Sequence, residues 1–111
     1  MEINVSYIDN KNVNSIINDS ILKDGVYLLK NENDNKPTYI FFKGKNNMVK
    51  NISVKLKNSS IEISATRDTS SNKSKLLYEF INYDNYANVS TTLKINKEAI
   101  DLGNIIFESN I

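Results

Sequence analysis

The chain contains 111 residues, of which 40% are hydrophobic and 24% are charged, and its formal net charge is +1. This length suits one domain over residues 1–111 with a modest core, and the mixture of charges is that of an ordinary folded protein. The sequence shows neither an apolar run long enough to span a membrane nor a secretory signal pattern. We therefore expect a cytoplasmic protein that makes no use of a membrane.

Histidine and cysteine are both absent, and there are only three glycines. Without imidazole or thiol groups, the chain lacks Ser-His-Asp and Cys-His catalytic sites, the usual zinc sites and disulfide bonds. Because the glycines are scattered, the glycine-rich loops that bind phosphates and dinucleotides are missing as well. We therefore expect a protein that is not an enzyme and that requires no metal or cofactor.

The N-terminal part of the chain predicts one strand followed by one helix. Residues 2–8 alternate between apolar and polar side chains, so a half-buried strand is expected with Ile3, Val5 and Tyr7 on its inner face. The period then changes to that of a helix over residues 13–21. The apolar stripe of this helix consists of Val13, Ile16, Ile17 and Ile21. We expect no second helix of this length.

The rest of the chain predicts short strands separated by turns rich in Asn, Ser, Asp and Gly. Strands are expected at residues 26–30, 38–43, 48–57, 61–67, 75–83, 88–95 and 104–108, and residues 96–104 are interpreted as a short helical turn or a loop. Residues 38–43 and 48–57 are expected to pair as a hairpin around residues 44–47. The 75–83 segment is apolar on both faces, which favours a strand covered on both sides.

Alternation within these strands assigns side chains to the core and to the surface. The inward-facing residues are expected to be Ile52, Val54 and Leu56, then Ile61, Ile63 and Ala65, and then Val89, Leu93 and Ile95. The pattern as a whole predicts a mainly β fold, an antiparallel meander of about seven or eight strands that forms a small barrel or a strongly bent sheet. One short helix near the N-terminus completes it. The alternative is an open α+β sheet.

The charges are unevenly distributed along the chain. Six lysines and no acidic residue lie from Lys36 to Lys57, and Ser53, Lys55 and Lys57 share the face opposite the core. The predicted partner-binding residues are Tyr39, Phe41, Lys43, Lys45, Lys50, Lys55 and Lys57. Lysines beside exposed aromatic rings suit an acidic protein surface or single-stranded nucleic acid. Alternatively, the lysines only keep the sheet soluble, while Tyr39 and Phe41 lie beneath the helix.

Acidic residues form two patterns that partly match known sites. Residues 31–35 match the opening of a calcium-binding loop, but Lys36 stands where that loop needs glycine and Phe42 where it needs glutamate. We therefore expect a solvated loop and no metal. Glu62 and Glu79 lie on neighbouring predicted strands, but both positions face solvent, so the burial that a catalytic carboxyl pair needs is missing.

One short segment resembles a known family of inhibitors. The chain length, the order of strand, helix and meander, and Leu102-Gly103 before the last strand are similar to the staphostatins, which are bacterial inhibitors of cysteine proteases. The resemblance implies that Gly103 and Asn104 contact a protease from a loop. The family has Gly-Thr-Ser where this chain has Gly103, Asn104 and Ile105, and no other stretch matches.

The missing catalytic residues and the lysine-rich segment together favour a binding protein. We expect a non-catalytic inhibitor or adaptor that occupies the surface of another protein, as small bacterial or phage-encoded inhibitors and immunity proteins do. The first alternative is a nucleic-acid-binding module that uses the lysine–aromatic hairpin. The second is a small barrel that encloses a ligand. The sequence leaves the oligomeric state open.

Overall fold

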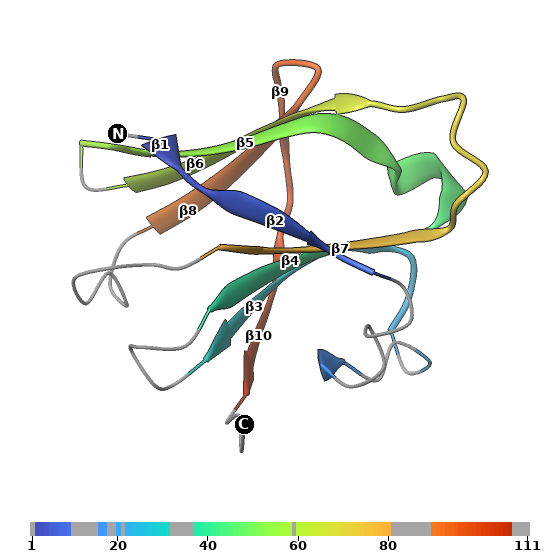
Figure 1. Cartoon of the computed structure of the whole chain (residues 1–111), viewed down its shortest axis with the longest axis horizontal. Coiled ribbons are helices and arrows are strands. Elements are labelled where there is room, and N and C mark those ends of the chain that lie inside the picture. The colour runs from blue at the N-terminus through green and yellow to red at the C-terminus, as the bar shows by residue number, and fades with distance from the viewer. Residues whose placement is uncertain are drawn as a thin grey trace.

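The computed structural model describes residues 2–9, 16–17, 20, 22–31, 37–58, 60–80 and 90–107, and it is mainly β. The strands are β1 (Glu2–Ile3), β2 (Val5–Ile8), β3 (Gly25–Asn31), β4 (Thr38–Lys43), β5 (Val49–Lys57), β6 (Ser60–Arg67), β7 (Lys75–Phe80), β8 (Ser90–Ile95), β9 (Glu98–Ile100) and β10 (Gly103–Phe107), and a short 3-10 helix, η2, spans Lys45–Asn47. They form two five-stranded sheets, sheet A in the order β1-β5-β6-β8-β9 and sheet B in the order β10-β3-β4-β7-β2 (Figure 1). No helix among the described residues is long and apolar enough to cross a membrane.

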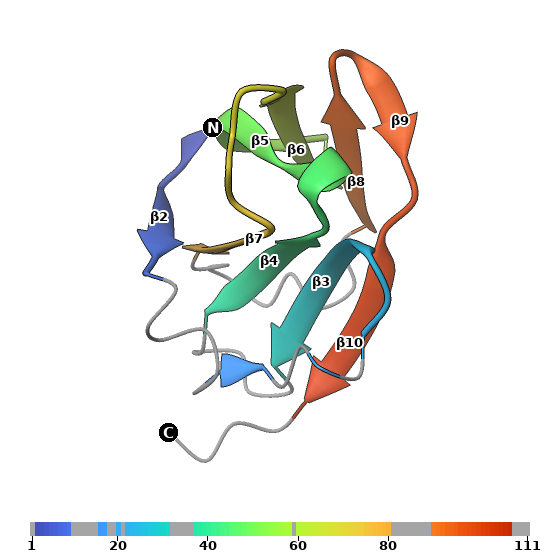
Figure 2. The same cartoon turned by 90° about the vertical axis from the view of Figure 1, so that its right-hand side faces the viewer.

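The two sheets do not close into a barrel, and their strand order is not that of a simple meander. Two of the strand pairs, β6 with β8 and β3 with β10, are parallel, whereas the others are antiparallel. The chain passes repeatedly from one sheet to the other, and Figure 2 shows β9 of sheet A leading directly into β10 of sheet B. A parallel neighbour requires a long connection, and the sequence pattern of a strand does not reveal such a partner.

The inter-sheet core consists of apolar side chains from the facing surfaces of both sheets. Its buried members are Val26, Leu28, Ile40, Phe42, Met48, Val49, Val54, Ile61, Ile63, Ala65, Leu76, Phe80, Leu93 and Ile95. The alternation predicted for β5 and β6 is confirmed, because Val54 is buried and Ile52 and Leu56 pack against the same core, while Lys55 and Lys57 are exposed. Each sheet buries one face against the other, and the hydrophobic effect of this burial stabilises the sandwich.

A second apolar layer, the outer cluster, covers the other face of sheet B. Its buried members Leu29, Phe41 and Leu77 come from the three middle strands of the sheet. The partly buried residues packed against it are Ile8, Ile16, Ile17, Leu22, Tyr27 and Tyr39. Strands β4 and β7 are therefore covered on both faces, as the sequence predicts for the 75–83 segment, of which residues 81–83 lie outside the described ones. Most residues of the predicted 13–21 helix also lie outside the described part of the chain.

The predicted hairpin between residues 38–43 and 48–57 is wrong. The strands at these positions, β4 and β5, belong to different sheets, so the connection through Gly44 and η2 carries the chain from one layer to the other. Gly44 has a φ of 108°, which favours glycine, and its backbone N–H donates to the carbonyl of Ser74 at 2.8 Å. This hydrogen bond joins the β4–β5 connection to the end of the 68–74 loop.

The single strand predicted at residues 2–8 is divided into two. β1 pairs with β5 in sheet A and β2 pairs with β7 in sheet B, with the break at Asn4. The alternation nevertheless continues across the break, since Ile3 and Val5 both pack against the inter-sheet core as expected. Tyr7, two residues after Val5 in β2, meets the ring of Tyr78 but leaves 43% of its surface accessible, so it is not a buried core residue.

The segment predicted as a helical turn or loop contains a β-hairpin instead. β8 and β9 are antiparallel and are joined by a two-residue turn, Asn96-Lys97. Both turn residues have positive φ, 51° and 68°, which identifies a type I′ turn. Such turns follow the natural twist of paired strands, so two residues suffice to reverse the chain.

Candidate functional site

The structure does not bring the predicted partner-binding residues to one surface. Phe41 is fully buried in the outer cluster of sheet B, and Tyr39 packs against the same cluster. Lys43 is partly buried and donates a hydrogen bond from Nζ to the carbonyl of Leu22 at 2.7 Å. The remaining residues, Lys45, Lys50, Lys55 and Lys57, are exposed, but Lys45 lies on η2 and the other three lie on β5 of sheet A. The separation follows from the sheet change between β4 and β5.

Lysine and aromatic side chains do meet at one end of the sandwich, in a hollow that we call the aromatic–lysine cleft. It has a volume of about 330 Å³ and lies between β2, β5, β7 and the 68–74 loop. Its lining consists of Tyr7, Val49, Lys50, Asn51, Asp68, Ser71, Lys73, Leu76 and Tyr78. Lys50 is the one predicted partner-binding residue that lines this cleft. The cleft therefore combines lysine with aromatic side chains, as predicted, but its aromatic residues are Tyr7 and Tyr78 instead of Tyr39 and Phe41.

A chain of aromatic contacts links the cleft to the core. Tyr7 and Tyr78 face each other across the β2–β7 pair, with ring centroids 5.5 Å apart and an interplanar angle of 61°. Tyr78 in turn meets Phe42 edge-on, with a centroid distance of 6.2 Å and an angle of 88°. Edge-to-face pairs of this kind are favourable beyond the area that they bury. Tyr7 is therefore an exposed ring on a rigid support.

Lys73 from the 68–74 loop caps the exposed ring. Its Nζ lies 4.7 Å from the centroid of Tyr7 and donates a hydrogen bond to the Tyr7 hydroxyl at 3.0 Å. This hydrogen bond raises the pKa of Lys73, so the ammonium form is favoured further. Partial burial raises the pKa of Tyr78, the neighbouring Tyr7 adds to this effect, and Lys73 opposes it. At neutral pH the cleft therefore presents the neutral phenol of Tyr78 beside the positive charge of Lys73.

The cleft also contains one carboxylate. Asp68 follows β6, and its Oδ1 accepts hydrogen bonds from the backbone N–H of Ser70 at 3.2 Å and from the Ser70 hydroxyl at 2.9 Å. These hydrogen bonds stabilise the turn at the start of the 68–74 loop, which contains Lys73. Among the lining residues, Lys50 and Lys73 thus supply two positive charges against one negative charge.

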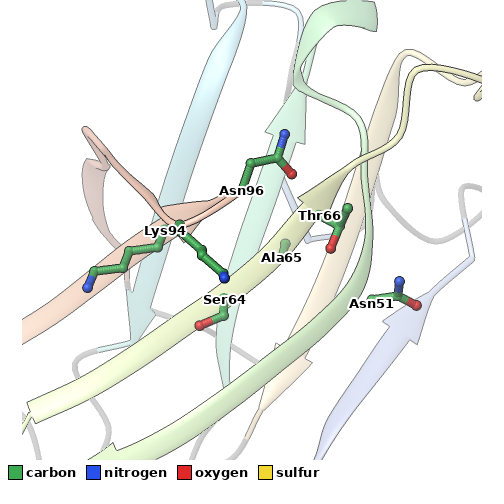
Figure 3. A pocket seen from close by; sticks show the side chains of 7 residues that line it. Asn51, Ser64, Ala65, Thr66, Lys94 and Asn96 are labelled. Atoms are coloured by element: carbon green, nitrogen blue, oxygen red, sulfur yellow. The ribbon is translucent and has the colours of Figure 1, made fainter.

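A second hollow, the polar pocket, lies on the face of sheet A that points away from sheet B (Figure 3). Its volume is about 700 Å³, and it is open to solvent. It is lined by Asn51, Ser64, Ala65, Thr66, Lys94, Asn96 and Lys97. Figure 3 shows the labelled side chains coming from three sources, β5, β6 and the β8–β9 hairpin. None of them belongs to the predicted partner-binding residues, and Ala65 was predicted only as a core residue.

Two irregularities of the backbone explain why this part of a sheet is hollow. The register of β5 and β6 shifts between Lys50 and Ser53, and Asn51 in this bulge has a φ of 54°. A bulge bends its strand and re-aims its side chains. On the other side, the Asn96-Lys97 turn is fixed by a bond from the backbone N–H of Arg67 to Asn96 Oδ1 at 2.9 Å. Asn96 also donates its backbone N–H to the Ala65 carbonyl at 3.1 Å.

The two hollows adjoin each other at the β5 bulge. Asn51 lines both of them, and Lys50 of the cleft stands opposite Thr66 of the polar pocket in the β5–β6 ladder. The sequence contained no strong signal for the β8–β9 hairpin, because Asn96-Lys97 lacks the glycine that type I′ turns favour. It also contained no signal that the chain leaves sheet A at Asn4 and that Tyr7 lies on β2, an edge strand of sheet B.

The remaining sequence candidates occupy positions with other roles. Gly103 opens β10 opposite Tyr27, and a Cβ atom there would lie 2.7 Å from a ring carbon of Tyr27. It therefore lets an aromatic ring pack on the strand, and Asn104 follows it in the same strand rather than in a loop. Glu62 and Glu79 lie in different sheets, so they are not neighbours.

Because the chain has no histidine or cysteine, carboxylates are its main candidate metal ligands. Within that part of the chain, no three acidic, histidine or cysteine residues cluster in a way that could hold a metal ion. Most of the calcium-like segment, residues 32–36, lies outside it. Comparison of the chain with protein-family models, with curated proteins and with solved structures gave no match. No family is therefore assigned to it.

Proposed function

We propose that the protein is a non-catalytic inhibitor or adaptor that binds an acidic segment of a partner protein in the aromatic–lysine cleft. The observation that carries the proposal is Tyr7, an exposed ring supported by Tyr78 and capped by Lys73. The absence of histidine and cysteine from the whole chain supports a role in binding rather than in catalysis. The small bacterial and phage-encoded inhibitors are the class of protein that this description fits.

Tyrosine is well suited to anchor a protein partner. Tyrosine side chains are enriched among the residues that dominate binding energy, because they bury a large apolar area with little loss of conformational freedom. The contacts of Tyr7 with Tyr78 and Lys73 fix its ring before a partner arrives. A prearranged anchor lowers the entropic cost of association, which favours binding through this residue.

The charges of the cleft favour an acidic polypeptide over nucleic acid. Lys50 and Lys73 attract the carboxylate of an acidic segment, and Asp68 opposes a strand with a phosphate at every nucleotide more strongly than a peptide whose carboxylates are spaced apart. Single-stranded nucleic acid remains the second candidate, because a base can stack on the exposed ring of Tyr7 while the lysines contact phosphates. The enclosed small-ligand barrel is not proposed, since the two sheets stay open.

Selection from a random peptide display library tests the proposed function directly. We expect the purified protein to enrich peptides in which an apolar residue stands beside aspartate or glutamate. The affinity of a selected peptide, measured by fluorescence polarisation, should fall at least about tenfold in Tyr7→Ala and also in Lys73→Gln, because each variant removes a principal contact. Lys57→Gln removes an equal charge from an exposed site outside the cleft and should bind normally.

Two results would contradict this proposal. The first is equal binding of the selected peptides to the Tyr7→Ala and unchanged proteins. The second is tight binding of a thymidine oligonucleotide that depends on Tyr7 and weakens steeply with added salt, which would identify the cleft as a nucleic-acid site instead. Circular dichroism of each variant shows that a loss of binding does not come from loss of folding.

A further inference from the structure

The lining of the polar pocket can supply hydrogen-bond donors and positive charge, but it contains no carboxylate. Its polar side chains are the ammonium groups of Lys94 and Lys97, the hydroxyls of Ser64 and Thr66, and the carboxamides of Asn51 and Asn96, whereas the side chain of Ala65 packs in the inter-sheet core. Lysine, serine, threonine and asparagine are the side chains through which proteins commonly contact phosphate oxygens. The chemistry of the lining therefore matches an oxyanion.

Backbone pairing determines where these donor side chains begin. Ser64 and Lys94 are direct partners in the β6–β8 ladder, so their side chains emerge side by side on the same face. The Asn96-Lys97 turn is tied to β6 through the Arg67 and Ala65 backbone groups. The donor groups thus extend from paired strands and a tight turn, so the backbone positions that carry them are fixed before a ligand binds.

Charge elsewhere on the same face leaves the pocket positive. Glu62 lies two residues before Ser64 in β6, on the same face, where its direct partner across the ladder is Lys55. The two side chains therefore offset each other next to the pocket. Lys94 and Lys97 retain their combined charge at the pocket itself, where it attracts an anion.

From this lining we infer that the polar pocket is a second binding site, for a small ligand that carries a phosphate or sulfate group on a body about the size of a monosaccharide. The volume of about 700 Å³ exceeds what a free ion fills and is within the range of small-molecule sites. Lys94 and Lys97 bind the oxyanion, and Ser64, Thr66 and Asn51 form hydrogen bonds with the polar body. The inference does not depend on the proposed function of the cleft.

Nuclear magnetic resonance titration of the ¹⁵N-labelled protein at constant ionic strength tests this site. The probes are inorganic phosphate, inorganic sulfate, glucose 6-phosphate and glucose. We expect saturable, one-to-one shifts of the amides at residues 64–66 and 94–97 with glucose 6-phosphate, weaker binding of the two inorganic anions, and none with glucose. The comparison separates the contribution of the anion from that of the sugar.

A pair of charge-matched variants supplies the control. Lys94→Gln/Lys97→Gln should weaken the binding of glucose 6-phosphate at least tenfold, whereas Lys45→Gln/Lys57→Gln, at two exposed positions outside the pocket, should leave it within about twofold. Tyr7→Ala should not change it, so failure of the cleft proposal and failure of this one are distinguishable. Equal weakening by both lysine pairs, shifts that do not saturate, or equal affinity for inorganic phosphate and the sugar phosphate would overturn the inference.

Discussion

Tyrosines at the edge of the apolar layers couple the stability of the protein to pH. Partial burial raises the pKa of Tyr78, and burial together with Glu79 raises the pKa of Tyr39. In the unfolded chain such phenols ionise near pH 10, whereas in the folded protein they keep their protons to higher pH. The resulting stabilisation is complete below about pH 10 and is lost as the pH rises through the folded pKa values.

Tyr78→Phe and Tyr39→Phe are therefore expected to change how stability depends on pH. Each variant removes one ionisable phenol, so the decline in the free energy of unfolding above about pH 10 should be shallower, and shallowest in the double variant. Urea denaturation followed by circular dichroism at several alkaline pH values measures this decline. Val54→Ala, which removes apolar packing only, should lower stability equally at every pH. A Tyr78→Phe curve parallel to that of the unchanged protein would rule out this linkage.

At the scale of strands, the local pattern predicts where a strand lies but not which strand it pairs with. β4 was expected at its observed bounds, and the alternation of β5 assigned Val54 and Lys55 to the correct faces. Hairpin pairing and passage to another sheet both begin with a glycine-containing turn, so the sequence around Gly44 did not distinguish them. The candidate site depended on this distinction, because the sheet change separates Phe41 from the exposed lysines of β5.

The cleft was missed for a related reason. Tyr7 follows the alternation of residues 2–8, which predicts a core-facing side chain. It lies instead on β2 at the edge of sheet B, where its partner is Tyr78 and part of its ring stays accessible. The loop residue Lys73 lies 66 positions away in the sequence, so only the folded structure brings it to the ring. Local periodicity contains no information about contacts at that separation.

Adding one methyl group at Gly44, in the β4–β5 connection, should lower the stability of the protein. Gly44→Ala places a side chain at a φ of 108° and a Cβ atom 2.7 Å from Cγ of Asp24, so we expect a loss of roughly 1–3 kcal/mol in the free energy of unfolding. Gly25→Ala is the matched control, because its Cβ atom would meet Tyr27 at an ordinary contact distance of 3.5 Å. Chemical denaturation of both variants measures the difference. A similar effect of the two substitutions would contradict the strained geometry assigned to Gly44.

At the scale of the whole molecule, sheet B is the middle layer of the protein. Its inner face packs against sheet A through Ile40 and Phe42, and its outer face contributes Phe41 to the outer cluster. Ile40, Phe41 and Phe42 are consecutive residues of β4 and are all fully buried, so this strand contributes to both apolar layers. The two apolar layers therefore share one backbone, and disruption of either one should loosen the other.

Phe41→Ala tests this shared dependence. The side chain is fully buried, so its removal should lower the free energy of unfolding by about 3–5 kcal/mol, whereas Tyr7→Ala at an exposed position should cost less than about 1 kcal/mol. Urea denaturation should show a single transition, coincident by far-ultraviolet circular dichroism and by tyrosine fluorescence, because the layers unfold together. If Phe41 instead belonged to an exposed lysine–aromatic surface, its truncation would cost as little as that of Tyr7. Two separate transitions in Phe41→Ala would show that the outer cluster is energetically independent of the inter-sheet core.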